Sequence, residues 1–262
     1  MGSFALPSQY QYEPVPVTVV GAGGTGGEVM DGLARLHFAL KALGHEYGLD
    51  VTLIDDDVVS ESNIGRQRFS PVDVGHPKAD LLIHRINLFY GLSWSARVWR
   101  ATEARELYPN RRHRALPLLI GCVDNPEARR VMHESWEGLG GLWLDYGNGR
   151  AQGQVVLGYR DRRNGLMLPS VMELFPSLWQ MEDDNEPSCS AAAALREQSL
   201  FMNRTLADTG LALLYKLFTA ASIEEHGALV DVDGLTTTPL PIDPAYWSFL
   251  GYEPKGAAEA VA

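Results

Sequence analysis

The chain has 262 residues, of which 45% are hydrophobic and 21% are charged. This is the composition of a globular protein with a substantial core, and the net charge of −11 disfavours nucleic acid or an anionic membrane as the main partner. Two cysteines give no disulfide framework, and the sequence has neither a signal-peptide pattern nor a membrane-spanning apolar run, so we expect a cytoplasmic protein.

Residues 1–14 contain serines, prolines and aromatic residues without periodicity, and they predict an irregular lead-in. A strand is expected over Val17–Val20, followed by a glycine loop over residues 21–27. A helix is expected from about Glu28 to about Leu43, with its apolar residues at helical spacing. Strand, glycine loop and helix together predict the start of a nucleotide-binding α/β unit.

The glycine loop has the order G-x-G-x-x-G at Gly21, Gly23 and Gly26. The first glycine permits a tight turn, the second lets a phosphate approach the backbone, and the third lets the helix pack on the strand. The N-terminus of the helix adds free N–H groups and a partial positive charge. The loop therefore predicts a phosphate-binding site.

The next expected strand, Val51–Ile54, ends at Asp55, where a carboxylate can hold ribose hydroxyls. A polar run over residues 60–67 follows and includes Arg66, and Lys78 comes soon after it. A guanidinium can bind phosphate through two hydrogen bonds, and a lysine supplies a compact charge. A dehydrogenase needs nothing particular in this stretch, so the run favours chemistry on the phosphates.

The middle of the chain continues to alternate between strands and helices, as a doubly wound, mainly parallel sheet requires. Cys122, at the end of a buried apolar run, is expected to be a packed core thiol. Strands are expected over residues 94–99, 118–123, 142–146 and 154–159, and helices over residues 79–92 and 125–139.

The last part of the chain changes in character. Residues 160–190 are polar and contain three prolines, so we expect a crossover loop that ends at Ser188-Cys189-Ser190. A helix over residues 191–221 and a hairpin over residues 228–242 should extend the same domain. The expected organisation is a lead-in (1–14), a Rossmann-like domain (15–160), a crossover loop (161–190), a C-terminal helix and hairpin (191–255), and a frayed tail (256–262).

Four motifs occur in a fixed order. They are G-x-G-G-x-G at 21–26, D-x-D-x-V-x-x-S-N-I-x-R-Q at 55–67, G-x-x-K at 75–78, and a strand that ends in D-N at 124–125. With Ile64 in place of a leucine, this series resembles the ThiF/MoeB/HesA family of adenylating enzymes, which are related to ubiquitin-activating enzymes. The resemblance covers roughly residues 15–220. The chain length and the stretch around Cys189 are most similar to the ThiF-related proteins of plasmid-borne ParB/ThiF-related (PRTRC) cassettes.

The resemblance implies ATP-dependent adenylation of the C-terminal carboxylate of a small ubiquitin-like or sulfur-carrier protein that ends in glycine. It implies ATP and Mg²⁺ as cofactors and a homodimer as the assembly. Asp55 would hold ribose, Asn63, Arg66 and Lys78 would contact the phosphates, and Asp124 would bind magnesium. The implied ATP-binding residues are Gly21, Gly23, Gly24, Gly26, Asp55, Asp57, Asn63, Arg66, Gln67 and Lys78, and the implied catalytic residues are Arg66, Lys78, Asp124 and Cys189.

Cys189 has two interpretations that the sequence leaves open. A thiol ahead of a helix can become a thiolate and attack the acyl-adenylate, or it can be a loop cysteine without chemistry. Many members of the family also hold a zinc ion with four cysteines, and two cysteines cannot supply them, so no structural zinc is expected. Residues 1–16 lack the arginine that some relatives extend toward the nucleotide of the partner subunit.

Three further alternatives remain at this stage. The chain can be a non-catalytic binding module of the same family. It can be a nicotinamide-dependent oxidoreductase, although that function leaves Asn63, Arg66, Gln67 and Lys78 without a purpose. Finally, Asp124 can cap the helix that begins at Pro126, in place of or in addition to binding a metal.

Overall fold

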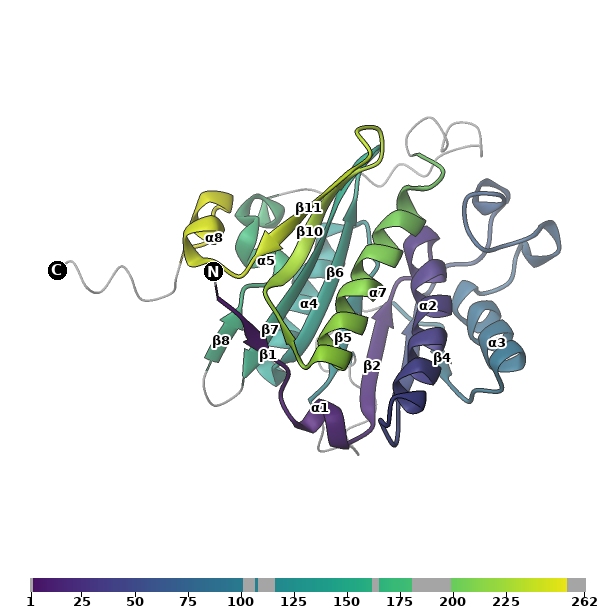
Figure 1. Cartoon of the computed structure of the whole chain (residues 1–262). Helices are drawn as coiled ribbons and strands as arrows, with labels where there is room; N and C mark the ends of the chain where they lie inside the picture. The colour runs from purple at the N-terminus through teal and green to yellow at the C-terminus, as the bar shows by residue number, and fades with distance from the viewer. Residues whose placement is uncertain (1, 101–106, 108–115, 162–164, 181–198, 254–262) are drawn as a thin grey trace.

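The computed structural model of the chain describes residues 2–100, 107, 116–161, 165–180 and 199–253. Within this part of the chain, a nine-stranded sheet forms the centre (Figure 1). Five strands are parallel: β2 (Val15–Val20), β3 (Leu49–Ile54), β4 (Ser95–Arg97), β5 (Leu118–Gly121) and β6 (Gly141–Asn148). Four continue the sheet in antiparallel fashion: β7 (Gln152–Asp161), β8 (Gly165–Leu168), β10 (Glu225–Asp231) and β11 (Thr236–Pro241).

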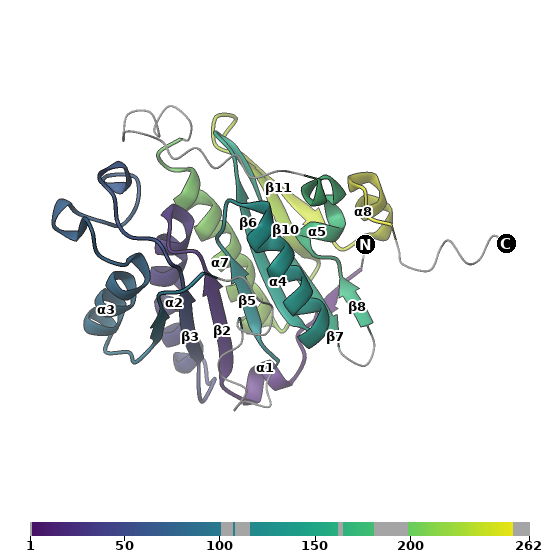
Figure 2. The same cartoon turned by 180° about the vertical axis from the view of Figure 1, so that it is seen from behind.

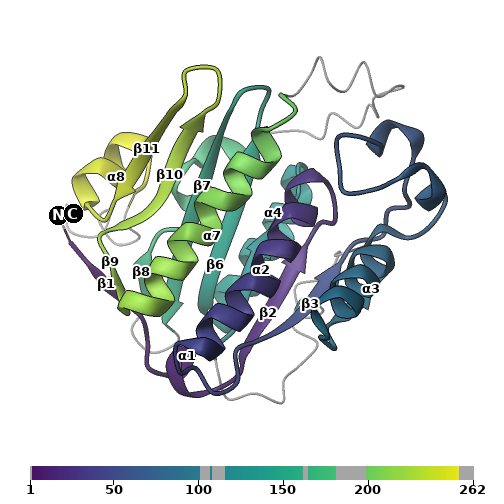
Figure 3. The ribbon, with the colours of Figure 1, turned by 45° about the vertical axis from the view of Figure 1, so that its right-hand side comes forward.

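Helices cover both faces of the sheet. One face carries α2 (Gly24–Ala42), α3 (Lys78–Tyr90) and α7 (Met202–Ala220), and α7 lies along α2 (Figures 1 and 3). The other face carries α4 (Pro126–Leu139), with the short helix α5 (Val171–Leu174) beside it (Figure 2). Helix α8 (Pro244–Leu250) follows the last strand. None of the helices described here has both the length and the apolar character needed to cross a membrane.

The predicted doubly wound α/β architecture is confirmed. Four of the five parallel strands, β2, β3, β5 and β6, are buried on both faces, as expected of strands with continuous apolar runs, whereas the edge strand β4 is largely exposed. Strand β5 begins at Leu118, after Pro117, which cannot donate a ladder hydrogen bond. Helix α2 begins at Gly24, inside the glycine loop and earlier than expected.

The strand order is β11-β10-β7-β6-β5-β2-β3-β4, with β8 paired to β7. The chain leaves β2 toward β3 on one side and leaves β5 toward β6 on the other. The connections after β2 and β5 therefore diverge and open a crevice at the carboxyl ends of these two strands. This switch in direction positions the candidate site.

The prediction of an irregular lead-in is wrong. Strand β1 (Phe4–Ala5) pairs with β9 (Ser222–Ile223), and helix α1 spans Gln9–Tyr12. Tyr10 is fully buried, and its hydroxyl donates to the carbonyl of Pro117 (2.9 Å) and accepts from the amide of Leu142 (3.0 Å). Phe4 and Tyr10 of this segment are core residues, which gives it a fixed structure, whereas Tyr12 is exposed.

The expected crossover loop is also more structured than its sequence suggests. After β8, the helix α5 and the 3-10 helix η4 (Pro176–Trp179) are ordered, and Ser170 and Glu173 form a capping box at α5. Residues 181–198, which include Cys189, lie outside the described residues, as does the predicted tail. Leu88 and Leu200 are exposed at the surface.

Candidate functional site

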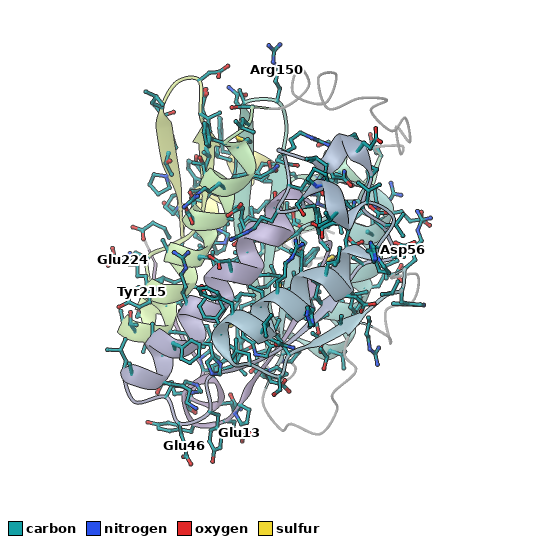
Figure 4. All side chains as sticks on the ribbon, turned by 90° about the vertical axis from the view of Figure 1, so that its right-hand side faces the viewer. Glu13, Glu46, Asp56, Arg150, Tyr215 and Glu224 are labelled. Carbon is teal, nitrogen blue, oxygen red and sulfur yellow. The ribbon has the colours of Figure 1, made fainter. Side chains whose placement is uncertain are left out.

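A cavity of about 740 Å³ lies at the carboxyl ends of β2, β3 and β5, and its size suits a small organic ligand. In Figure 4, Asp56 is a labelled residue that lines the cavity. Arg150, just after β6, and Glu13, just before β2, mark opposite ends of the molecule. Residues from several segments line the cavity, namely Gly21, Gly23, Gly24, Thr25, Asp55, Asp56, Asp57, Arg66, Gln67, Lys78, Trp99, Arg100, Cys122, Asp124, Tyr146, Asn148 and Asn203.

The glycine loop folds tightly over β2. Gly21 has φ +99°, a conformation that side chains disfavour, and a Cβ on Gly26 would collide with the carbonyl oxygen of Gly21. Gly26 therefore packs beneath the loop and does not line the cavity. A Cβ on Gly23 would meet no other atom closer than Nε2 of Gln67, at 3.9 Å, so the space above this glycine is open to a ligand.

Asp55 joins the glycine loop to the turn after β3. Its Oδ2 accepts the amide of Ala22 (2.6 Å), and its Oδ1 accepts the amide of Asp57 (2.8 Å). Burial raises the pKa of Asp55, and the two amides oppose that shift. Each carboxylate oxygen has a second lone pair, so Asp55 can still accept hydrogen bonds from a ligand.

Asp57 positions Lys78. The Lys78 ammonium lies 2.7 Å from the Asp57 carboxylate, and the Lys78 amide donates to the Asp57 carbonyl (2.9 Å). The Lys78 side chain is only 8% exposed, whereas that of Asp57 is 64% exposed. A buried ammonium needs such a partner, because an isolated buried charge is costly. The ion pair therefore holds a cation in the cavity wall.

Arg66 and Gln67 each bring a buried polar atom to the cavity. Arg66 Nε and Gln67 Oε1 have no hydrogen-bond partner among the described residues. Buried polar atoms are nearly always paired in folded proteins, so these two atoms could gain hydrogen bonds if their side chains shift toward a ligand in the cavity that they line. One is a donor and the other an acceptor.

Asn63 fixes the backbone that carries Arg66 and Gln67. Its carbonyl accepts the amides of Gln67 (2.9 Å) and Arg66 (3.3 Å), and its side-chain Oδ1 accepts the amide of Ser60 (2.9 Å). Asn63 is buried and does not line the cavity. Its observed role is to fix the turn that carries Arg66, and its predicted phosphate contact stays a prediction.

Asp124 is exposed in the cavity, directly after β5. The cap of α4 is the next residue, Asn125, whose Oδ1 accepts the amide of Ala128 (2.7 Å). The alternative in which Asp124 caps this helix is therefore wrong. Arg129 steadies the preceding backbone by donating to the carbonyl of Val123 (2.6 Å).

Cys122 differs in part from its prediction. It follows β5 and is half-buried in the cavity wall, against the glycine loop. Burial raises the pKa of this thiol well above its usual range, with a further contribution from Asp145. The thiol is therefore neutral at physiological pH and unsuited to nucleophilic attack.

The sequence did not identify Thr25, Trp99, Arg100 or Asn203 as site residues. Asn203 comes from α7, and its Oδ1 accepts the Thr25 hydroxyl (3.0 Å) across a separation of 178 residues. Asn148, the last residue of β6, also donates to this oxygen (2.7 Å). A buried amide on the apolar face of a helix is the one signal that marked Asn203.

No group of three or more His, Cys, Asp or Glu side chains in the described part of the chain could hold a metal ion. A magnesium ion bound together with a nucleotide needs only one or two carboxylates, because phosphate and water complete its shell. Asp124, exposed in the cavity lining, can supply one such carboxylate.

Comparison with known proteins gives three findings. A model of the ThiF family matches residues 1–238. The adenylyltransferase and sulfurtransferase UBA4 of Yarrowia lipolytica (strain CLIB 122 / E 150) is 28% identical over 133 residues, or 50% of this chain and 30% of that protein. The chain thus matches less than a third of this curated relative's length.

Solved structures resemble the fold at low sequence identity. Escherichia coli MccB in complex with SeMet MccA has a TM-score of 0.61 and 16% identity, and the match covers 94% of this chain and 67% of that one. PaaA has a TM-score of 0.59 and 16% identity, with 89% and 66% covered. At this identity the likeness shows a shared fold.

Proposed function

The chain belongs to the ThiF family, and from that premise we propose that it is an adenylating enzyme that activates a carboxylate with ATP. The main support is the cavity itself, in which a glycine cradle, a strand-end carboxylate and the cations Arg66, Lys78 and Arg100 meet. The Arg66 guanidinium in the cavity lining carries the proposal furthest, because phosphate is the natural acceptor for a guanidinium donor.

In this proposal the triphosphate lies over Gly23 and Gly24, at the N-terminus of α2, and the ribose lies against Asp55. Free amides at a helix N-terminus favour an anion, and the strand-end carboxylate suits ribose hydroxyls. Arg66 and Lys78 face the same space and supply positive charge. The distribution of charge across the cavity therefore matches the polarity of a nucleotide.

The reaction forms one bond and breaks one. An oxygen of the substrate carboxylate attacks the α-phosphorus, the bond from that phosphorus to the bridging oxygen breaks, and pyrophosphate leaves. Negative charge moves toward the leaving group, so Arg66 and Lys78 stabilise the transition state from fixed positions. Asp124 is the residue we assign to a magnesium ion, which would neutralise phosphate charge.

We assign the acyl substrate to a second cavity of about 860 Å³, which shares Asp124 and Asn148 with the first. The turn between β6 and β7 and the strands β10 and β11 border it. The C-terminal tail of a small ubiquitin-like or sulfur-carrier protein, ending in glycine, is the substrate that we assign to this opening. A homodimer is part of the same proposal.

Mass spectrometry of small proteins that end in glycine, after incubation with this protein, ATP and Mg²⁺, tests the proposal. We expect an adenylate on the carrier's C-terminus. ATP binding without any adenylate would instead support a non-catalytic binding module. Hydride transfer from a nicotinamide cofactor would support an oxidoreductase.

Transfer to Cys189 is a separate step and stays a prediction. We expect Cys189→Ala to form the adenylate normally and to lose any carrier adduct that a reductant cleaves. An adenylate as the sole product of the wild-type protein, together with normal downstream transfer by the variant, would remove Cys189 from the reaction.

A further inference from the structure

We propose that Asn203 is a positioning residue that holds the glycine loop in its ligand-binding shape. The inference rests on the proposed function in one respect, namely that ATP is the ligand of this loop. Asn203 lies in the first turn of α7, is 6% exposed and lines the nucleotide cavity. Figures 1 and 3 show α7 beside α2, the helix that begins in the loop.

One oxygen atom joins three parts of the fold. Oδ1 of Asn203 accepts the hydroxyl of Thr25, in the first turn of α2, and the side-chain amide of Asn148, at the end of β6. The amide of Ser199 also donates to the carbonyl of Arg150 (2.7 Å), so the start of α7 is tied to the turn between β6 and β7 at a second point. These contacts therefore link the glycine loop, the end of β6 and the start of α7 to one another.

Steric contact adds to these hydrogen bonds. A Cβ on Gly24 would collide with Nδ2 of Asn203. Gly24 has no unusual backbone conformation that would itself require glycine. The Asn203 amide therefore explains why this position of the loop has no side chain.

The network is suited to positioning. Its members are neutral, and a buried, satisfied network rigidifies the groups that it joins. The amides at the start of α2 must keep a fixed spacing to bind phosphate, and Thr25 belongs to that turn. Loss of one hydrogen bond in the network should therefore loosen the loop, even though the backbone amides that bind the ligand are all still present.

Two substitutions that compensate for each other test the steric part. We expect Gly24→Ala to weaken ATP binding at least tenfold in calorimetry, because its methyl group displaces Asn203. In the Asn203→Ala background the same methyl group has space, so Gly24→Ala should then cost less than about threefold. An equal cost in both backgrounds would overturn the proposed contact.

The hydrogen-bonding part needs a second set of variants. Thr25→Val should weaken ATP binding about tenfold, as expected for one hydrogen bond, and Thr25→Ser, which keeps the hydroxyl, should restore it. Thr25→Val should have no further effect in the Asn203→Ala background. Thr205→Val is the matched control, because the Thr205 hydroxyl donates within α7 to Phe201 and lies outside the cavity lining.

Thermal unfolding of each variant separates a loosened loop from a damaged fold. The inference fails if the wild-type protein binds ATP and Thr25→Val binds it equally well. It also fails if the effects of Thr25→Val and Asn203→Ala simply add. Failure of the wild-type protein to bind ATP would instead count against the proposed function, so the two failures are distinguishable.

Discussion

Two walls of the nucleotide cavity, on either side of the end of β5, are built differently. One wall, residues 20–78, carries the glycine loop, the acids after β3, Arg66 and Lys78, and its key contacts join residues that are close in sequence. Asp55 bonds to Ala22 across 33 residues, and Lys78 pairs with Asp57 across 21. The other wall consists of the end of β6 and the start of α7, and its contacts span up to 178 residues.

The two walls therefore have different roles: the first acts on the ligand, and the second stabilises the first. The first wall offers charges to a ligand, and these charges need fixed spacing along the chain. The second wall offers neutral amides that hold the first wall in place. The predictions below therefore expect the largest effects on catalysis from the first wall, and effects on stability or loop shape from the second.

The largest effect should come from the cations. We expect Arg66→Ala or Lys78→Ala to reduce carrier-dependent pyrophosphate exchange about 100-fold or more, because each removes a preorganised group that faces the developing charge. ATP affinity, measured by calorimetry, should fall less than the exchange rate does.

Arg68→Ala is the control for these two variants. Arg68 is close in sequence, but it pairs with Glu28 and Asp31 (3.5 and 3.4 Å) and is absent from the cavity lining. Its exchange rate should match that of the wild type. Equal losses of ATP affinity and rate in the Lys78 variant would show that Lys78 contributes ground-state binding alone.

The antiparallel part of the sheet, which lies outside both walls, should respond to pH through its stability. His226 of β10 is fully buried, with Nδ1 bonded to the carbonyl of Leu157 (2.9 Å) and Nε2 accepting from the indole of Trp247 (2.8 Å). Burial lowers the pKa of His226 from 6.5 to about 4. The folded state therefore favours the neutral ring.

A lowered histidine pKa stabilises the fold above the unfolded pKa, and that stability is lost as pH falls from 6.5 toward 4. The shift corresponds to about 3 kcal/mol in the free energy of unfolding. Denaturant unfolding at several pH values should show this loss in the wild type. His226→Gln should be less stable at pH 7 and should lack that part of the pH dependence, and parallel pH curves for both proteins would contradict the assignment.

A smaller effect should follow from Asp55. We expect Asp55→Asn to weaken ATP binding by about 1.5–3 kcal/mol, the range for hydrogen bonds to a charged group. The substituted amide oxygen can still accept one backbone N–H, so the fold should persist. Unchanged ATP affinity in calorimetry would remove Asp55 from the site.

The sequence could predict the first wall because local motifs place its residues. The apolar runs around Val17–Val20 and Leu118 predicted buried parallel strands, and the glycine order predicted the turn above them. The second wall could not be predicted, since Thr25 and Asn203 meet only after the whole sheet has formed. Tyr10 was missed for the same reason, because its partners Pro117 and Leu142 come from distant strands.

The most direct test of the proposed adenylation is ATP–pyrophosphate exchange by the wild-type protein, with Mg²⁺ and a co-purifying small protein that ends in glycine. We predict that labelled pyrophosphate enters ATP only when this carrier is present. The same carrier without its terminal glycine should give no exchange. A protein that binds both ATP and the intact carrier, yet shows no exchange, would contradict the proposed reaction.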